Sequence, residues 1–73
     1  MIKNVTILGA GESGFGAAML ASKKGFNVFV SDFNSIDDNI KLLFEDHSIE
    51  YEENKHSIDK IQSSDLVIKS PGI

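Results

Sequence analysis

The sequence predicts an α/β fold, a parallel sheet of about four strands in the order 3-2-1-4 with helices on both faces. Three observations predict it. Short β-branched segments alternate with helix-forming segments, a glycine-rich turn follows the first strand segment, and no repeat or cysteine framework indicates another class. Alternation of this kind requires parallel pairing through right-handed crossovers. With 73 residues the chain makes one domain, residues 1–73.

The first strand and the first helix are predicted from opposite local compositions. Residues 2–8 form a β-branched run that ends at Gly9, as is typical of a strand covered on both faces. Residues 14–24 are rich in helix formers, with apolar side chains on one stripe, and Gly25 stands where a C-terminal cap belongs. The glycines therefore predict where each element ends.

A second strand and a second helix follow directly. Residues 26–31 are β-rich and end at Asp32. Ser35, followed three positions later by Asp38, resembles a capping box, and apolar residues then repeat at helical spacing to about residue 46. These signals predict a helix that begins just after Ser35.

The last third of the chain predicts a short edge strand, a short helix and a final strand. Residues 49–52 alternate apolar and acidic side chains, which suits the edge of a sheet. Ser57 can cap a helix of one to two turns with Ile58 and Ile61 facing inward. Residues 65–70 then give a β-rich run that a proline ends.

Composition excludes several classes of function. Seven lysines and no arginine stand against eleven acidic residues, a formal net charge of −4, which argues against a nucleic-acid partner. No apolar run approaches the roughly 18 residues of a membrane span, and no secretory pattern opens the chain, so we expect a soluble, intracellular protein without a membrane partner. The absence of cysteine and the spacing of the two histidines predict no metal site.

The most informative motif is G-x-G-x-x-G between the first strand and the first helix, as in Rossmann-like nucleotide-binding folds. Gly9 allows the tight turn, Gly11 lets backbone N–H groups approach a diphosphate, and Gly14 lets the helix close onto the sheet. The anion then sits at the helix N-terminus, where unpaired N–H donors and a partial positive charge await it. The alternative is a glycine-rich connection that binds nothing.

Two further segments are expected at the same edge of the sheet. Asp32 lies 18 positions after Gly14, close to the spacing of an acid that accepts hydrogen bonds from a ribose. Its alternative role is to cap the loop that follows, through Asn34 and Ser35. The segment Ser70-Pro71-Gly72 ends the last strand and leaves bare backbone near the glycine turn, although it could also be an ordinary strand terminator.

Together these motifs resemble the N-terminal domain of the Mur ligases. The resemblance covers the whole chain and is carried by Gly9-Ala-Gly-Glu-Ser-Gly-Phe-Gly-Ala-Ala, by Val-Ser-Asp32, and above all by Asp65-Leu-Val-Ile-Lys-Ser-Pro-Gly-Ile. It is closest to the branch that adds D-glutamate to UDP-N-acetylmuramoyl-L-alanine. In this family of cytoplasmic enzymes the N-terminal domain binds the UDP part of the precursor, a central domain binds ATP and Mg²⁺, and a C-terminal domain helps to bind ATP and the amino acid.

The resemblance also implies a role for each site residue. It places Glu12 and Ser13 at the diphosphate, although the Glu12 carboxylate would repel an anion unless it faces solvent or is paired with a cation. The residues that it places around the uridine are Asp32, Phe33 and Asn34 on one side and Ser70, Pro71 and Gly72 on the other. Phe33 departs from the hydrogen-bonding residue common at its position in the family, and we expect it to pack against the base.

The implied function is the UDP-sugar-binding part of an ATP-dependent ligase of peptidoglycan synthesis, in a chain with two further domains. The sequence has no G-x-x-x-x-G-K-[ST] loop, so the expected ATP and Mg²⁺ site lies beyond Ile73, and residues 1–73 alone should catalyse nothing. Three alternatives remain open: the first half of an NAD(P)-binding oxidoreductase domain, a nucleotide-sensing regulatory domain, and a sister Mur ligase that adds another amino acid.

Overall fold

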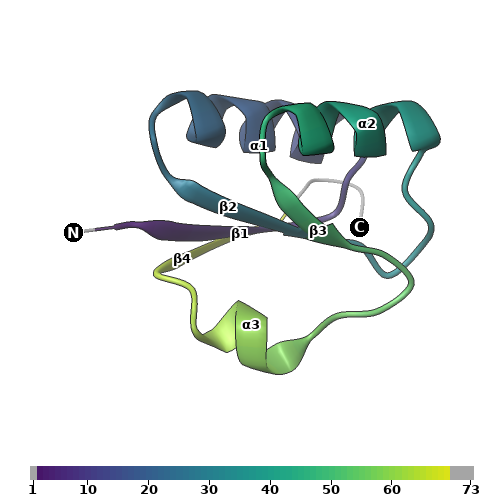
Figure 1. The fold of residues 1–73 in the computed structure, drawn as a ribbon. Coiled ribbons are helices and arrows are strands. Elements are labelled where there is room, and N and C mark those ends of the chain that lie inside the picture. The colour runs from purple at the N-terminus through teal and green to yellow at the C-terminus, as the bar shows by residue number, and fades with distance from the viewer. Residues whose placement is uncertain (1, 70–73) are drawn as a thin grey trace.

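A computed structural model describes residues 2–69 of the chain, in which four strands alternate with three helices (Figure 1). The elements in chain order are β1 (Asn4–Leu8), α1 (Glu12–Lys23), β2 (Asn27–Ser31), α2 (Asp38–Asp46), β3 (Glu50–Glu52), α3 (Ile58–Gln62) and β4 (Leu66–Lys69). None of the helices in this part of the chain is long and apolar enough to cross a membrane.

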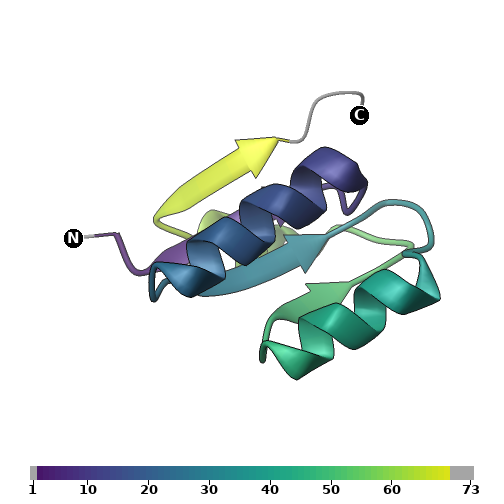
Figure 2. The ribbon, with the colours of Figure 1, turned by 90° about the horizontal axis from the view of Figure 1, so that it is seen from above.

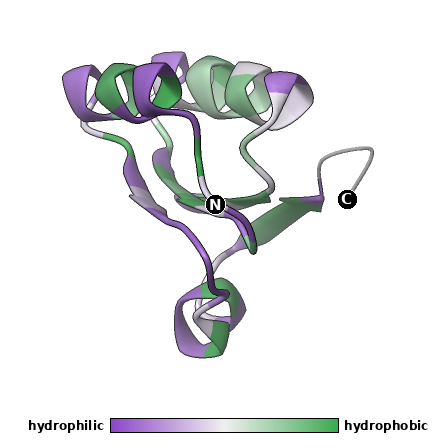
Figure 3. Ribbon diagram, turned by 90° about the vertical axis from the view of Figure 1, so that its right-hand side faces the viewer, coloured by the Kyte–Doolittle hydropathy of each residue, from purple (hydrophilic) through white to green (hydrophobic). Residues whose placement is uncertain are grey.

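The four strands form one parallel sheet in the order β3-β2-β1-β4, which confirms the predicted topology. Helices α1 and α2 cover one face of the sheet and α3 lies against the other (Figures 1 and 3). Seen from above, α1 and α2 run side by side over the sheet, with the visible strand arrows pointing to the same edge (Figure 2). The carboxyl ends of all four strands therefore meet at one edge.

The main core lies between the sheet and the layer of α1 and α2. Its fully buried members include Ile7 of β1, Val30 of β2, Ala18 of α1 and Phe44 of α2. Small side chains on α1 bring that helix close to the strands, and the Phe44 ring fills the space between α2 and the sheet. The Phe44 ring centroid lies 5.9 Å from that of Tyr51 on the edge strand, so α2 and β3 are fixed against each other by an aromatic contact.

Some element boundaries differ from those that local sequence predicts. Helix α1 begins at Glu12, two residues before the predicted start, and ends at Lys23. Gly25, the predicted cap, directly follows the C-cap residue Lys24 and has a left-handed φ of +90°. The predicted capping box at Ser35 is wrong, because Asp37 caps α2 by accepting from the Asn39 N–H. Ile58 is also not inward, since it is 58% exposed.

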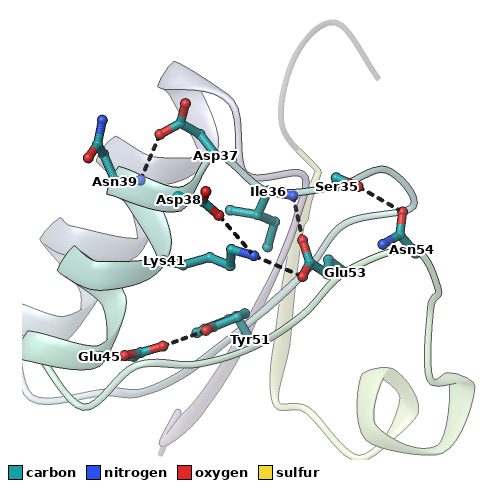
Figure 4. A network of polar contacts seen from close by, with 10 residues as sticks. All are labelled: Ser35, Ile36, Asp37, Asp38, Asn39, Lys41, Glu45, Tyr51, Glu53 and Asn54. Atoms are coloured by element: carbon teal, nitrogen blue, oxygen red, sulfur yellow. Dashed lines mark hydrogen bonds and ion pairs between the residues drawn. The ribbon is translucent and has the colours of Figure 1, made fainter.

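The loops that flank α2 and β3 are joined by a polar network (Figure 4). Glu53 Oε1 accepts from the Ile36 backbone N–H at 2.8 Å, and its Oε2 lies 3.0 Å from Lys41 Nζ. Lys41 Nζ also pairs with Asp38 at 3.3 Å. The Ile36 N–H and then Lys41 lower the pKa of the Glu53 carboxyl, so it is ionised at neutral pH. This network ties the start of α2 to the end of β3.

The start of β4 is attached to the start of β1 through one carboxylate. Asp65 Oδ2 accepts from the backbone N–H groups of Asn4 and Lys3, each at 2.9 Å. The hydrogen bond from the Asn4 N–H, and then that from the Lys3 N–H, lower the pKa of the Asp65 carboxyl below its ordinary value. The stability that they supply is fully present above the unfolded-state pKa and is lost as pH falls towards the lower, folded-state pKa.

We therefore expect Asp65→Asn to be less stable than the parent at pH 7 and the difference to shrink as the pH falls to about 3, below the ordinary Asp pKa. Urea unfolding followed by circular dichroism at both pH values measures it. Asp46→Asn is the matched control, because the Asp46 carboxylate at the end of α2 makes no hydrogen bond within residues 2–69. A difference that does not change with pH would contradict the role given to the Asp65 carboxylate.

Candidate functional site

The glycine turn lies at the carboxyl edge of the sheet, between β1 and α1. Gly9 has a φ of +100° and donates its N–H to Ser31 O at 2.8 Å, so the turn is fixed to the end of β2. A Cβ on Gly14 would lie 1.8 Å from Gly9 O, a contact that no side chain can make. Helix α1 thus closes directly onto the turn, and only glycine fits at position 14.

Gly11 differs from the other two glycines because its Cβ position is open. A Cβ there would meet nothing within 4 Å, and its φ of −72° suits any residue. Gly11 is the N-cap of α1 and offers no side chain to the N–H groups of the first turn, which have no partner inside the helix. The exposed residues Glu12 and Ser13 follow it. The site therefore presents backbone donors at an unobstructed helix N-terminus.

The Glu12 carboxylate occupies the first turn of α1 and is exposed. A negative charge at this position stabilises the helix through its dipole. Because the Glu12 side chain is exposed, water screens its negative charge, and this reduces its repulsion of an anion bound at the same turn.

Asp32 connects the glycine turn to the loop after β2. Its Oδ2 accepts from the Ala10 N–H and its Oδ1 accepts from the Asn34 N–H, both at 2.8 Å. The hydrogen bond to the Asn34 N–H is the loop-capping role that the sequence left open as an alternative. The hydrogen bond to the Ala10 N–H was not predicted from the sequence. A carboxylate has about four lone-pair sites, so each oxygen of Asp32 retains the capacity to accept from a ligand hydroxyl.

A partly buried polar cluster surrounds Ser31, the residue before Asp32, and it was not predicted from the sequence. Ser31 Oγ lies 2.7 Å from Glu52 Oε2, 2.6 Å from His56 Nδ1 and 3.2 Å from the Lys55 carbonyl oxygen. Glu52 also accepts from the N–H and the hydroxyl of Ser57, each at 2.6 Å. Ser31 is 0% exposed, so this Ser, His and Glu arrangement cannot present a nucleophile to a substrate.

The charge state of Glu52 is set by two opposing effects. Burial raises the pKa of the Glu52 carboxyl, but the hydrogen bonds from the Ser57 hydroxyl, the Ser57 N–H and the Ser31 hydroxyl together outweigh it and lower that pKa. Glu52 is therefore an ionised acceptor at neutral pH. The sequence signal for this cluster was that Glu52 ends the edge strand and that His56 and Ser57 follow it closely; their approach to Ser31 depends on the tertiary fold.

Phe33 and Asn34 follow Asp32 on the surface of this edge. The Phe33 side chain is 69% exposed, and its ring centroid lies 5.6 Å from that of His56 with a tilt of 30°. Asn34 is exposed and its carbonyl oxygen accepts from the Asn54 N–H at 3.2 Å. The loop after β3 therefore packs on the loop after β2 and supplies an aromatic partner for Phe33.

The structure brings most of the predicted site residues to this one edge: Gly9, Gly11, Glu12, Ser13, Gly14, Asp32, Phe33 and Asn34. The remaining three, Ser70, Pro71 and Gly72, lie outside the described residues. The last described residue, Lys69, is paired with Leu8 in the register of β4 and β1.

A separate groove of about 250 Å³ lies between α3 and the sheet, and no predicted site residue lines it. Lys60 contributes to it, with its Nζ 4.6 Å from the Phe29 ring centroid and 2.7 Å from Glu50. Thr6 and Ser64 also line the groove, and their hydroxyls are hydrogen-bonded to each other. These contacts attach α3 to the sheet, and we assign the groove no part in the candidate site.

The chain is similar to known proteins in both sequence and structure. Residues 4–73 match the family model described as the MurD N-terminal domain. Proteins named UDP-N-acetylmuramoylalanine--D-glutamate ligase are 54% identical in Bacteroides thetaiotaomicron and 53% in Bacteroides fragilis, each over 72 residues and 99% of this chain. The protein of the same name from Christiangramia forsetii is 49% identical over 73 residues, the whole of this chain. The chain spans 16% of the length of each of these relatives.

The structural comparison finds a crystal structure of malate dehydrogenase from Cryptosporidium parvum, with a TM-score of 0.61 and 23% sequence identity. The match covers 100% of this chain and 26% of that one, and at this identity it supports the α/β fold alone. The family is shown instead by the sequence, because the family model spans nearly every residue and the relatives are about half identical over the same length. The chain belongs to the family of MurD N-terminal domains.

Proposed function

We propose that residues 1–73 bind the UDP part of UDP-N-acetylmuramoyl-L-alanine, for an ATP-dependent ligase that joins D-glutamate to it in peptidoglycan synthesis. The name shared by the relatives supports the reaction. The geometry supports the binding role, and one observation carries it: an open helix N-terminus at Gly11 lies beside the Asp32 carboxylate, which is bonded to the same turn. We place the enzyme in the cytoplasm, as the family resemblance implies.

In this proposal the diphosphate lies on the N–H groups at the start of α1, where unpaired donors and the helix dipole favour an anion. The Ser13 hydroxyl is a further donor, and Asp32 accepts from the ribose hydroxyls with its remaining lone pairs. Phe33 packs against the base, and Ser70, Pro71 and Gly72 complete the pocket from the other side. Glu12 remains in solvent.

The contribution of the domain to the reaction is placement. A nucleotide held at one end of a long substrate fixes the position of the distant carboxyl group, so that binding energy is used for orientation. No step of the chemistry is assigned to residues 1–73.

ATP and Mg²⁺ do not fit the residues present. The sequence contains no G-x-x-x-x-G-K-[ST] phosphate loop, and within residues 2–69 no three His, Cys, Asp or Glu side chains are grouped to hold a metal ion. We therefore propose that both bind to parts of the ligase outside these residues, and that residues 1–73 alone are inactive.

Ligand choice tests this proposal against an NAD-binding domain. We expect the 73-residue chain to bind UDP with a dissociation constant of order 1 mM, roughly 4 kcal/mol, since a helix terminus supplies at most about 2 kcal/mol and no arginine is present to clamp phosphate. Amide chemical shifts are followed during parallel titrations with UDP, UDP-N-acetylmuramoyl-L-alanine and NAD. Both uridine ligands should shift Gly11 and Asp32, and NAD should not. A clear preference for NAD would overturn the ligase assignment.

A further inference from the structure

His56 is the member of the partly buried polar cluster around Ser31 that contacts both the buried Ser31 and the exposed Phe33 of the candidate site. Its Nδ1 contacts Ser31, the fully buried residue directly before Asp32. Its ring lies against the ring of the exposed Phe33, directly after Asp32, at a tilt of 30°. The ring is half-buried, so one side is held by protein and the rest borders solvent. This position gives His56 a route to influence Phe33 without itself lying in the glycine turn.

The hydrogen-bond geometry determines which nitrogen of His56 carries a proton. The Ser31 hydroxyl has one proton, and Glu52 Oε2, an ionised acceptor 2.7 Å away, is its strongest partner. Ser31 Oγ must then accept from His56, 2.6 Å away, so Nδ1 is the protonated nitrogen. The other nitrogen, Nε2, has no hydrogen-bond partner within residues 2–69, and no buried side-chain atom there is left unpaired, so Nε2 is open to solvent.

The anchored imidazole in turn limits the freedom of Phe33. A phenyl ring that is 69% exposed would otherwise move among several rotamers, and an aromatic partner whose ring centroid lies 5.6 Å away, at a tilt of 30°, favours one of them. Ordering a side chain before the ligand arrives removes part of the entropy cost of binding. The chain of contacts therefore runs from Glu52 through Ser31 and His56 to Phe33.

We propose that His56 is a positioning residue for base recognition: its ring, anchored to Ser31, holds Phe33 so that the free face of the phenyl group stacks on the nucleobase. This inference rests on the proposed function, because it needs a nucleotide at this edge. It goes beyond that function by assigning a role to the loop after β3, which lies outside the glycine turn and outside the residues implied by the resemblance.

The test uses the longest natural chain that contains residues 1–73 and two probes, UDP and inorganic pyrophosphate. UDP carries a base and a diphosphate and pyrophosphate carries no base, so the comparison separates binding of the base from binding of the diphosphate. Phe33→Leu removes the stacking face, and we expect it to weaken UDP binding by about tenfold, within the range of base stacking on an aromatic ring. His56→Asn removes the imidazole ring but keeps an N–H donor near the Nδ1 position. We expect it to weaken UDP binding by about fivefold, part of the same stacking contribution. Pyrophosphate binding should be unchanged in both variants.

Two controls distinguish positioning from a general structural effect. His47→Asn is matched, because His47 also has its Nδ1 bonded, to Leu43 O at 2.9 Å, but it caps the far end of α2. It should bind UDP as the parent does. In a double-mutant cycle, His56→Asn should change UDP binding by less than about twofold when Phe33 is already leucine, because its effect passes through Phe33.

A measurement without substitution covers the case in which a variant does not fold. The ring resonances of His56 should move when UDP is added and stay in place with pyrophosphate, and those of His47 should move with neither. Three results would overturn the inference alone. They are unchanged UDP affinity of the His56→Asn variant, equal losses of UDP and pyrophosphate affinity in that variant, and a loss of UDP affinity on His56→Asn that is the same whether residue 33 is phenylalanine or leucine. If the parent chain binds neither UDP nor pyrophosphate, the proposed function is overturned as well.

Discussion

Gly14→Ala is expected to lose a large part of the stability of the fold. The added methyl group would stand 1.8 Å from a backbone oxygen, Gly9 O, and 2.8 Å from its carbon, so the helix or the turn must move away. Moving a helix off its turn breaks the packing of α1 on β1, and we expect a cost of at least about 3 kcal/mol, in the upper range for overpacking. That is much of the total stability, about 4–11 kcal/mol, available to a chain of this size. Urea unfolding followed by circular dichroism measures the loss.

Gly16→Ala provides the matched control for this substitution. Gly16 lies in the same helix, two residues further on, and a Cβ there would meet nothing within 4 Å. Alanine in a helix interior is favoured over glycine by about 0.8–1 kcal/mol, so this variant should be more stable than the parent. Equal unfolding midpoints for the two variants would contradict the close contact between Gly14 and Gly9.

Gly11→Val is expected to abolish UDP binding and leave the fold in place. The Cβ position of residue 11 is free of protein atoms and its φ of −72° is open to valine, so the side chain would occupy the space into which the diphosphate must come. Loss of glycine from the N-cap should cost about 1 kcal/mol of stability. We expect UDP affinity to fall by at least about tenfold, from an order of 1 mM to beyond detection. Calorimetry with UDP and circular dichroism of the variant measure the two effects.

The same substitution at Gly16 controls for bulk on α1 as such. Gly16→Val adds an identical side chain to another open position of the helix, away from its N-terminal N–H groups. It should retain UDP binding. If Gly11→Val binds UDP as the parent does, the glycine turn is a structural connection and no diphosphate site.

The topology could be predicted from the sequence because it depends on features that are local. Alternation of strand and helix segments determines parallel pairing, and Gly9 and Gly25 mark the ends of β1 and α1 with the left-handed backbone that their positions suggested. The edge strand and its alternation of Ile49, Tyr51 and acidic residues were predicted in the same way. Each of these features depends on fewer than about ten neighbouring residues, and such signals survive without tertiary context.

Features that depend on tertiary contacts could not be predicted. The capping box failed because Ser35 donates instead to Asn54, a residue 19 positions away, and Asp37 took the cap. Similarly, the contact of Ser31 with His56 joins residues 25 apart, and nothing in either local sequence indicates it. Asp32 was predicted as a ligand residue from its spacing, but its bond to Ala10 could be seen only once the turn and β2 were placed together.

The structure of the domain with UDP bound is the measurement that decides where the nucleotide lies. We predict diphosphate oxygens within hydrogen-bonding distance of the backbone N–H groups of residues 11–14, with a ribose hydroxyl donating to Asp32. The groove between α3 and the sheet, on the other side of β1 and β2, offers a clear alternative position. A diphosphate found in that groove, or a UDP molecule that leaves the N-terminus of α1 free, would contradict the proposed site.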